Sequence, residues 1–220
     1  MYKLNKNICP ICESDRINKF SKDKQREYFI CSQCNLIYVP DKYFISEKEE
    51  KARYDLHNNN FENKGYVKFL ERLLTPMNKI LSPKSNGLNY GSGPEPVLSI
   101  MFEKQGHNMT NYDPFYTKKI ENCSNRFDFI TLTEVVEHFY YPKKEFEKIQ
   151  SLLKPGGIIG IMTKLTDNVN NFSKWYYKND KTHVCFYSKE TFKFIAKKIK
   201  ATPYFIKKDD VILMFSTNIS

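Results

Sequence analysis

Four cysteines near the N-terminus have the spacing of a metal site. Cys9 and Cys12 form one C-x-x-C pair, and Cys31 and Cys34 form a second pair after 18 intervening residues. Two such pairs can place four thiolates around one Zn²⁺ ion, which leaves no open position for a substrate. We therefore expect a structural zinc site, because a module of about 40 residues buries too little core to fold alone. The alternatives are two disulfides, which a reducing compartment disfavours, or a redox-active pair.

A second set of chemically capable residues lies in the C-terminal half of the chain. Glu134, Glu137 and His138 are spaced i, i+3 and i+4, so a helix would place them on one face. His183 lies in a long segment, WYYKNDKTHVCFYS, that follows an apolar strand-like run. These four side chains can hold one divalent ion that binds and deprotonates a diol or catechol. Without an ion, Glu137, His138 and His183 are candidate acid–base residues, or else His138 and His183 only fasten the backbone.

Residues 86–117 predict a strand, a tight glycine turn, a helix and a second strand. In chain order these elements cover residues 88–90, 91–93, 94–105 and 108–112. Pro94 suits the first turn of the expected helix, and Gly106 ends it. The second strand leads to Asp113, which follows Gly93 by 20 residues. This spacing suits a carboxylate that accepts hydrogen bonds from ribose hydroxyls.

The glycine turn favours a ligand that contains ribose but no phosphate. A dinucleotide-binding loop would carry a third glycine and present a bare helix N-terminus to the pyrophosphate. Glu95 and Pro96 occupy that region instead, and a carboxylate there would repel phosphate. S-adenosylmethionine (SAM) has a ribose, no phosphate and a positive sulfonium, so it fits better. Glu95 can meet the ammonium group of SAM or can simply favour the start of the helix.

These segments occur in the order found in class I SAM-dependent methyltransferases, which the chain resembles. Residues 128–133 resemble the fourth strand of that family, and residues 134–138, EVVEH, resemble its E-V-L-E-H segment. Residues 152–157, LLKPGG, and the strand at 158–163 resemble its L-K-P-G-G turn and fifth strand. The resemblance covers about residues 84–217. The four-cysteine module is also similar, more loosely, to those of zinc-bearing methyltransferases.

The resemblance implies where SAM binds. The residues implied to contact it are Tyr90, Gly91, Ser92, Gly93, Asp113, Pro114, Thr133 and Glu134. Asn89 departs from the family, which usually has an acidic residue at this position. The stretch from Asp113 to Phe127 leaves little room for the family's third strand, so we expect a trimmed sheet edge. The E-x-x-E-H segment with a later histidine also resembles the metal-binding residues of small-RNA 2′-O-methyltransferases.

The remaining pattern predicts an α/β fold. Helices are expected over residues 46–57, 64–81, 143–153 and 188–200, and a terminal hairpin over 201–218. Strands that alternate with helices give a Rossmann-like, mostly parallel sheet with helices on both faces. We expect three parts: a zinc-ribbon-like module at 1–45, a helical connector at 46–83 and a methyltransferase domain at 84–220. Cys123 and Cys185 lie outside the four-cysteine pattern and are expected to be free core thiols.

Composition limits the class of partner. Lys and Arg number 35 against 25 Asp and Glu, a net charge of +10, but the basic residues are scattered rather than clustered. The charge can attract RNA, although scattered basic residues more often reflect the overall amino-acid composition than a nucleic-acid-binding surface. No apolar run approaches the ~20 residues of a membrane helix, and no signal peptide is recognisable, so we expect a cytoplasmic protein without a membrane partner.

These observations together predict a SAM-dependent methyltransferase with a small-molecule acceptor. The methyl group would go to an oxygen or nitrogen atom, with zinc in a structural role. One alternative is an RNA methyltransferase that uses the zinc ribbon and the basic surface. Another is a non-catalytic zinc-ribbon module with a vestigial Rossmann-like domain. The aromatic residues around His183 predict either a lid over the acceptor or anchors that fasten the loop; they are Trp175, Tyr176, Tyr177, Phe186 and Tyr187.

Overall fold

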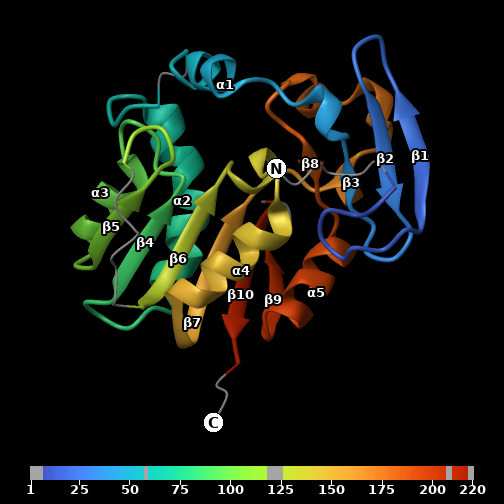
Figure 1. Ribbon diagram of the computed structural model, residues 1–220. Coiled ribbons are helices and arrows are strands. Elements are labelled where there is room, and N and C mark those ends of the chain that lie inside the picture. The colour runs from blue at the N-terminus through green and yellow to red at the C-terminus, as the bar shows by residue number, and fades with distance from the viewer. Residues whose placement is uncertain (1–6, 57–58, 118–125, 207–209, 218–220) are drawn as a thin grey trace.

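A six-stranded sheet forms the centre of the computed structural model, which describes residues 7–56, 59–117, 126–206 and 210–217 (Figure 1). The strand order is β5-β4-β6-β7-β10-β9. The first four strands are parallel: β5 (Asn108–Tyr112), β4 (Asn86–Tyr90), β6 (Phe127–Thr133) and β7 (Leu153–Met162). The last two, β10 (Val211–Ser216) and β9 (Ala201–Ile206), form the expected antiparallel hairpin at the C-terminal side.

Helices cover both faces of this sheet because its central strands are apolar on both sides. Successive side chains of a strand point to opposite faces. In β6, Phe129 belongs to the apolar cluster of α2 (Lys64–Asn78) and α3 (Val97–Lys104). Ile130 belongs to the cluster of α4 (Pro142–Leu152) and α5 (Lys189–Lys198) on the other face. The predicted α/β class, with helices on both faces, is therefore confirmed (Figure 1).

Two details at the sheet edge follow from local chemistry. Among the described residues, the sheet ends at β5 on this side, while residues 118–125 of the stretch that was expected to trim this edge lie outside them. The helix expected from Pro94 begins at Val97 instead. The reason is Pro96, because the residue before a proline is disfavoured in the α conformation. Residues 91–96 therefore stay in an open loop in front of α3.

The four-cysteine module belongs to a second, smaller sheet. Its strands are β1 (Ile17–Lys22), β2 (Glu27–Cys31), β3 (Ile37–Tyr38) and β8 (Cys185–Phe186), in that order. β1 and β2 form an antiparallel hairpin, but β8 comes from the chain that follows β7. Ile37 pairs with Phe186, and Tyr38 pairs with Cys185. The module and the large sheet consequently share one apolar core.

Helix α1 (Glu47–Tyr54) connects the two sheets above the ends of the parallel strands (Figure 1). A capping box formed by Ser46 and Glu49 starts it. Short 3-10 helices cover Asp41–Tyr43 (η1), Val136–His138 (η2), Thr166–Asn168 (η3), Phe172–Lys174 (η4) and Tyr176–Asn179 (η5). None of the described helices has the length and apolar character that crossing a bilayer demands. Cys123 lies outside the described residues, and so does the expected hairpin turn at 208–210 except for Asp210, whereas Cys185 is a buried free thiol.

Candidate active site and four-cysteine cluster

The predicted cofactor and acid–base residues gather at one edge of the large sheet. Gly91 follows β4, Asp113 follows β5, and Glu134 follows β6. Parallel strands end at the same edge, so the loops after them meet there. Figure 1 shows this edge beneath α1. The topology therefore brings together residues that lie more than 40 positions apart in the sequence.

The shape of the glycine loop requires glycine at two of its positions. Gly91 and Gly93 have φ angles of +81° and +65°, in the left-handed region that favours glycine. A Cβ atom on Gly91 would lie 2.5 Å from a methyl carbon of Val135, whereas a Cβ on Gly93 would meet nothing within 4 Å. The N–H groups of Gly91 and Ser92 both donate to the carbonyl of Tyr112, at 2.7 and 3.0 Å. The loop is thus fixed against β5 and packs on the segment after β6, and Gly93 borders open space.

Asp113 closes the other side of this loop. Its Oδ2 accepts a hydrogen bond from the N–H of Gly93 at 2.9 Å. Its Oδ1 accepts from the N–H groups of Phe115 and Tyr116, at 2.9 and 3.3 Å, in the turn that Pro114 begins. A carboxylate oxygen can accept about two hydrogen bonds. Among the described residues Oδ2 accepts only one, so the carboxylate retains an acceptor position suited to a ribose hydroxyl.

The end of β6 carries a buried polar atom that lacks a partner. The hydroxyl of Thr133 is buried and has no hydrogen-bond partner among the described residues. Buried hydroxyls are nearly always hydrogen-bonded, because an unpaired one costs about 1–3 kcal/mol. A polar ligand at this edge would satisfy it. The unpaired hydroxyl, the open space at Gly93 and the acceptor on Asp113 together fit a ligand with ribose and amino-acid groups.

Two residues next to the glycine loop serve the protein core. The hydroxyl of Tyr90 donates to Glu145 of α4 at 2.5 Å, so its side chain is committed to that helix. The amide of Asn89 donates to Ser99 at 3.1 Å and accepts from Thr131 at 3.3 Å. Asn89, the departure from the family pattern, therefore forms a buried hydrogen-bond network beneath the loop.

The segment after β6 is not the helix that the spacing of its residues predicted. The N–H of Glu134 donates to the carbonyl of Met162 at 2.8 Å, which extends the pairing with β7 by one residue. Glu134 then turns the chain with a left-handed φ of +52°, and only Val136–His138 form a short 3-10 helix. Glu134 and Glu137 consequently do not share a helix face.

Tyr177 joins these two glutamates instead. Its hydroxyl lies 2.5 Å from Oε1 of Glu137 and 3.2 Å from Oε2 of Glu134. The hydroxyl of Thr163, after β7, donates to the other carboxylate oxygen of Glu137 at 3.0 Å. Burial raises the pKa of both glutamates, and the negative charge of Glu134 raises that of Glu137 further. Burial, with the two nearby carboxylates, also raises the pKa of Tyr177 well above its usual value.

The two histidines are oriented by backbone carbonyls. Nδ1 of His138 lies 3.2 Å from the carbonyl of Thr182, and Nδ1 of His183 lies 2.7 Å from that of Tyr177. Because a carbonyl can only accept, each Nδ1 carries the hydrogen, and in the neutral ring each Nε2 holds the lone pair. Burial lowers the pKa of His183 to about 4, although the charge of Asp180 opposes this shift. His183 is therefore neutral at neutral pH.

These contacts bring three predicted acid–base residues into one cluster. The ligand atoms of Glu137, His138 and His183 all lie within 4.8 Å of one another. Glu134, the fourth residue of the expected divalent site, lies outside this cluster and is connected to it through Tyr177. A carboxylate and two imidazoles whose Nδ1 atoms are held by carbonyls form a donor set suited to a divalent metal.

The aromatic residues around His183 divide into two groups. Tyr177, Phe186 and Tyr187 are buried, and Phe186 lies in β8, so these side chains anchor the segment to the core. Tyr176 is 66% exposed. Trp175 is half-buried and packs against the same core, so the anchoring interpretation describes four of the five residues. The sequence offered no signal for the hydroxyl of Tyr177 between the two glutamates, since it depends on a contact across 40 residues.

The four cysteines of the N-terminal module converge. The Sγ atoms of Cys9 and Cys34 are 3.5 Å apart, those of Cys12 and Cys31 are 3.4 Å apart, and all four lie within 4.8 Å of one another. A disulfide requires about 2.05 Å. Four sulfurs at ~2.3 Å from a Zn²⁺ ion would be about 3.8 Å apart. The geometry therefore fits a tetrahedral four-thiolate site and does not fit disulfides.

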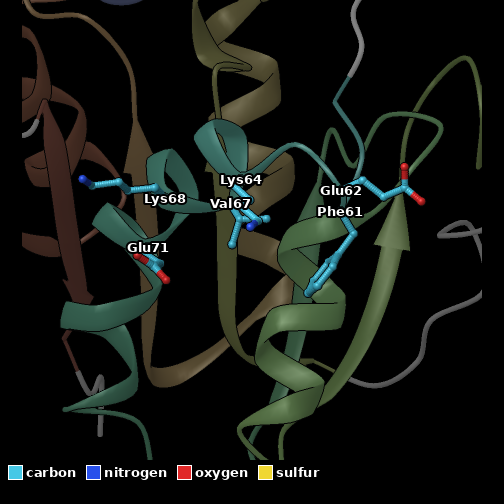
Figure 2. Close-up of a pocket in the computed structure, with 6 residues that line it drawn as sticks. All are labelled: Phe61, Glu62, Lys64, Val67, Lys68 and Glu71. Atoms are coloured by element: carbon cyan, nitrogen blue, oxygen red, sulfur yellow. The ribbon is translucent and has the colours of Figure 1, made fainter.

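A further hollow lies at the start of α2 (Figure 2). Its volume is about 440 Å³, and it is lined by Phe61, Glu62, Lys64, Val67, Lys68 and Glu71. Phe61 lies beneath the ammonium group of Lys104 of α3, at 3.8 Å from the ring centre. None of the predicted cofactor, acid–base or metal residues lines this hollow, so it gives no support to the site at the sheet edge.

Solved structures with the same fold include several methyltransferases. One is the 1,6-didemethyltoxoflavin-N1-methyltransferase of Burkholderia thailandensis with bound 1,6-didemethyltoxoflavin and S-adenosylhomocysteine. It is 14% identical with a TM-score of 0.56, and the match covers 91% of this chain and 99% of that chain. Another is a chain from the complex between the Haloferax volcanii Trm112 methyltransferase activator and the putative methyltransferase. It is 11% identical with a TM-score of 0.52, and the match covers 79% of this chain and 98% of that chain. At these identities the likeness shows the fold.

The sequence of the chain also matches a family model. No curated protein matches it in a direct sequence search. Residues 57–199 match the model described as "Methyltransferase domain", and this range is more than half of the chain. It contains the glycine loop, Asp113 and the cluster of Glu137, His138 and His183. The prediction of a methyltransferase is thereby confirmed: the chain belongs to the methyltransferase domain family.

Proposed function

We propose that this protein transfers a methyl group from SAM to an oxygen or nitrogen atom of a small molecule. The observation that carries the proposal is the position of the segment 133–138. Its first residue, Thr133, offers an unpaired buried hydroxyl, and Val135 packs against Gly91 of the glycine loop. Its last two residues belong to the histidine–glutamate cluster. One short segment thus borders both a cofactor position and an acceptor position.

The cofactor position is formed by the loop and the carboxylate beside it. Bound SAM would supply a methyl group on a sulfonium, which leaves as a neutral thioether and needs no acid. Asp113 would accept hydrogen bonds from the ribose hydroxyls, and Thr133 would pair with a polar group of the cofactor. The loop Gly91–Gly93 would let the backbone approach the ligand closely. Together, Asp113, Thr133 and the loop would hold the reactive methyl group pointing toward the acceptor, in a site that excludes water.

The acceptor position is formed by Glu137, His138 and His183. The lone-pair nitrogen Nε2 of either histidine can receive the proton that an O–H or N–H acceptor releases as the new bond forms. The same three side chains can hold a divalent ion, which would bind a diol or catechol oxygen and lower its pKa. Tyr177 and Thr163 fix the Glu137 carboxylate in either case. The metal-assisted form favours oxygen over nitrogen as the methylated atom.

The four-cysteine cluster would hold zinc in a structural role. The proposal rests on the sulfur separations and on the absence of any water or substrate position in a four-thiolate site. The cluster is part of the sheet that includes β8, two residues after His183. Bound zinc would therefore stabilise the sheet next to the acceptor position.

Labelled methyl transfer tests this proposal. The protein is incubated with methyl-labelled SAM and Mn²⁺, together with either a cellular small-metabolite extract or total RNA. We expect label in the small-molecule fraction, and less of it in the Glu137→Gln protein. Label confined to RNA, with an affinity that falls steeply with salt, would replace the small-molecule proposal with the RNA methyltransferase.

A further inference from the structure

Arg26 reaches from the four-cysteine module into the segment that carries Tyr177 and His183. It lies in the turn between β1 and β2, and its side chain is almost completely buried, with 5% exposed. Its guanidinium donates to four backbone carbonyls of one short run: Lys178, Asp180 at 2.9 Å, Lys181 at 3.2 Å and His183 at 3.0 Å. The carbonyl of Lys178 lies in the last turn of the 3-10 helix η5, and the other three follow that helix; carbonyls at a helix end have no partners within the helix. A guanidinium has five donors in a planar fork and no acceptor, so it suits such a cluster.

An ion pair also attaches this run to the turn between β1 and β2. In this pair the turn supplies the negative charge and the run supplies the positive charge. The ammonium group of Lys178 lies 2.7 Å from Oδ2 of Asp23, and the Lys178 side chain is only 4% exposed. Asp23 also accepts from the hydroxyl of Tyr28 at 2.8 Å. The module therefore contributes a cation to the carbonyls of the run and a carboxylate to its buried lysine.

The run that Arg26 holds also orients both histidines of the acceptor position. The carbonyl of Thr182 accepts from His138, and the carbonyl of Tyr177 accepts from His183. Arg26 does not bind these two carbonyls but binds their neighbours in the chain: Tyr177 directly precedes Lys178, and Thr182 lies between Lys181 and His183. Movement of the run by an ångström would break or lengthen both bonds, and with them the direction of both Nε2 atoms.

We propose that Arg26 is a positioning residue for the acceptor site, and that the four-cysteine module acts on methyl transfer through it. The inference rests on the proposed function for its consequence and on the hydrogen bonds above for its geometry. It assigns the module a second task beyond its own folding: it holds the segment 177–183 in the form that directs His138 and His183. In this proposal the four-cysteine module binds the segment 177–183 of its own chain.

The experiment compares Arg26→Ala and Arg26→Lys with Arg16→Ala in zinc-loaded protein without added Mn²⁺. Arg16 is an exposed arginine of the same module whose side chain donates a hydrogen bond to Gln33. Two-bond ¹H–¹⁵N spectra report the tautomer of each histidine. We expect both Arg26 variants to lose the Nδ1–H signature of His183, whereas His107, bonded to Asn78 elsewhere, keeps its signal. Amide exchange at residues 178–184 should become about tenfold faster or more, with zinc content and the amides of β2 unchanged.

Two results would overturn the inference. One is an unchanged His183 signature and unchanged exchange in both Arg26 variants. The other is loss of zinc and of β2 protection in both, which would reduce Arg26 to a residue needed for the module to fold. Arg26→Lys keeps the charge and most of the buried stem, so it stays informative if Arg26→Ala does not fold. S-adenosylhomocysteine binding by the wild-type protein is measured alongside; its failure would remove the proposed function without changing the result on the loop.

Discussion

The backbone N–H of Gly93 donates a hydrogen bond to the carboxylate of Asp113, with 2.9 Å between nitrogen and oxygen. This bond connects the loop after β4 to the end of β5, two strands that pair in parallel along their whole length. Asp113 therefore helps to set the shape of the glycine loop, and we propose that its remaining acceptor position receives a ribose hydroxyl. A change at Asp113 should disturb both the loop and the ligand contact.

Replacement of Asp113 by alanine should weaken the binding of S-adenosylhomocysteine by more than tenfold, which is about 1.4 kcal/mol. Isothermal titration of the wild-type and Asp113→Ala proteins measures the difference. Asp128→Ala is the matched control, because that carboxylate bonds Asn86 and Lys154 near the opposite end of β6. Equal affinities of the wild-type and Asp113→Ala proteins would contradict the ribose assignment.

The cluster of Glu137, His138 and His183 predicts a site for one divalent ion. Titration with Mn²⁺, followed by electron paramagnetic resonance, should show one bound ion in zinc-loaded wild-type protein. Glu137→Gln should weaken this binding by about tenfold or more, because a charged ligand is lost while the side-chain shape is kept. Glu134→Gln is the matched control, since Glu134 lies outside the cluster. Equal weakening by both variants would show that Glu134 is a ligand too, and no binding by the wild type would exclude the ion.

The four-cysteine cluster predicts close to one equivalent of zinc in protein purified under reducing conditions without chelator. Cys34→Ser should lose most of the zinc and lower the Tm by more than about 5 °C, because bound metal contributes folding energy. Cys185→Ser should keep its zinc, since this buried thiol faces the carbonyl of Phe139 outside the cluster. Elemental analysis and a thermal melt provide both readings. Wild-type protein that folds without zinc would contradict the assignment.

The ion pair of Asp23 with Lys178 should make the attachment of the segment 177–183 to the four-cysteine module sensitive to acid. Burial alone would raise the pKa of Asp23, but hydrogen bonds from Lys178 and from the backbone of Arg26 and Gln25 hold it well below its usual value. A carboxyl with a lowered folded-state pKa stabilises the fold above its unfolded pKa of about 3.9, and this contribution disappears as the pH falls.

The free energy of unfolding should therefore fall less steeply in Asp23→Asn than in wild type between about pH 5 and about pH 3. The charged or titratable groups around Asp23 are Lys178, Arg26 and Tyr28, so the difference isolates this one carboxyl. Urea titrations at each pH measure it, with Glu190→Gln, an exposed carboxyl paired to Lys193, as the control. Parallel curves for wild type and Asp23→Asn would contradict the prediction.

The parts of the fold that depend on local sequence could be predicted from it. The strand–glycine–helix–strand unit, the buried strands and the terminal hairpin each leave a pattern within about 30 residues. The spacing of the cysteines likewise indicated a four-thiolate cluster, because each C-x-x-C pair fixes two ligands through its own backbone. The position of Asp113 beside the glycine loop was also predictable, because β4 and β5 are parallel and end at the same edge of the sheet.

The parts that depend on contacts between distant segments could not be predicted. Nothing near Arg26 in the sequence indicates that its side chain binds carbonyls more than 150 positions away. The spacing of Glu134 and Glu137 indicated a helix, but pairing of Glu134 with Met162 of β7 prevents one. Tyr177 then joins the two carboxylates by reaching across from η5. In each case a tertiary contact outweighs the local pattern.

Calorimetric titration of S-adenosylhomocysteine into folded, zinc-loaded protein measures whether this chain binds the proposed cofactor. It requires neither the acceptor nor a second metal, and it probes only the edge formed by Gly91–Gly93, Asp113 and Thr133. We predict binding of one equivalent with a Kd in the micromolar range. No heat of binding in such protein would contradict the proposed cofactor site, and it would favour a non-catalytic binding module on a vestigial methyltransferase fold.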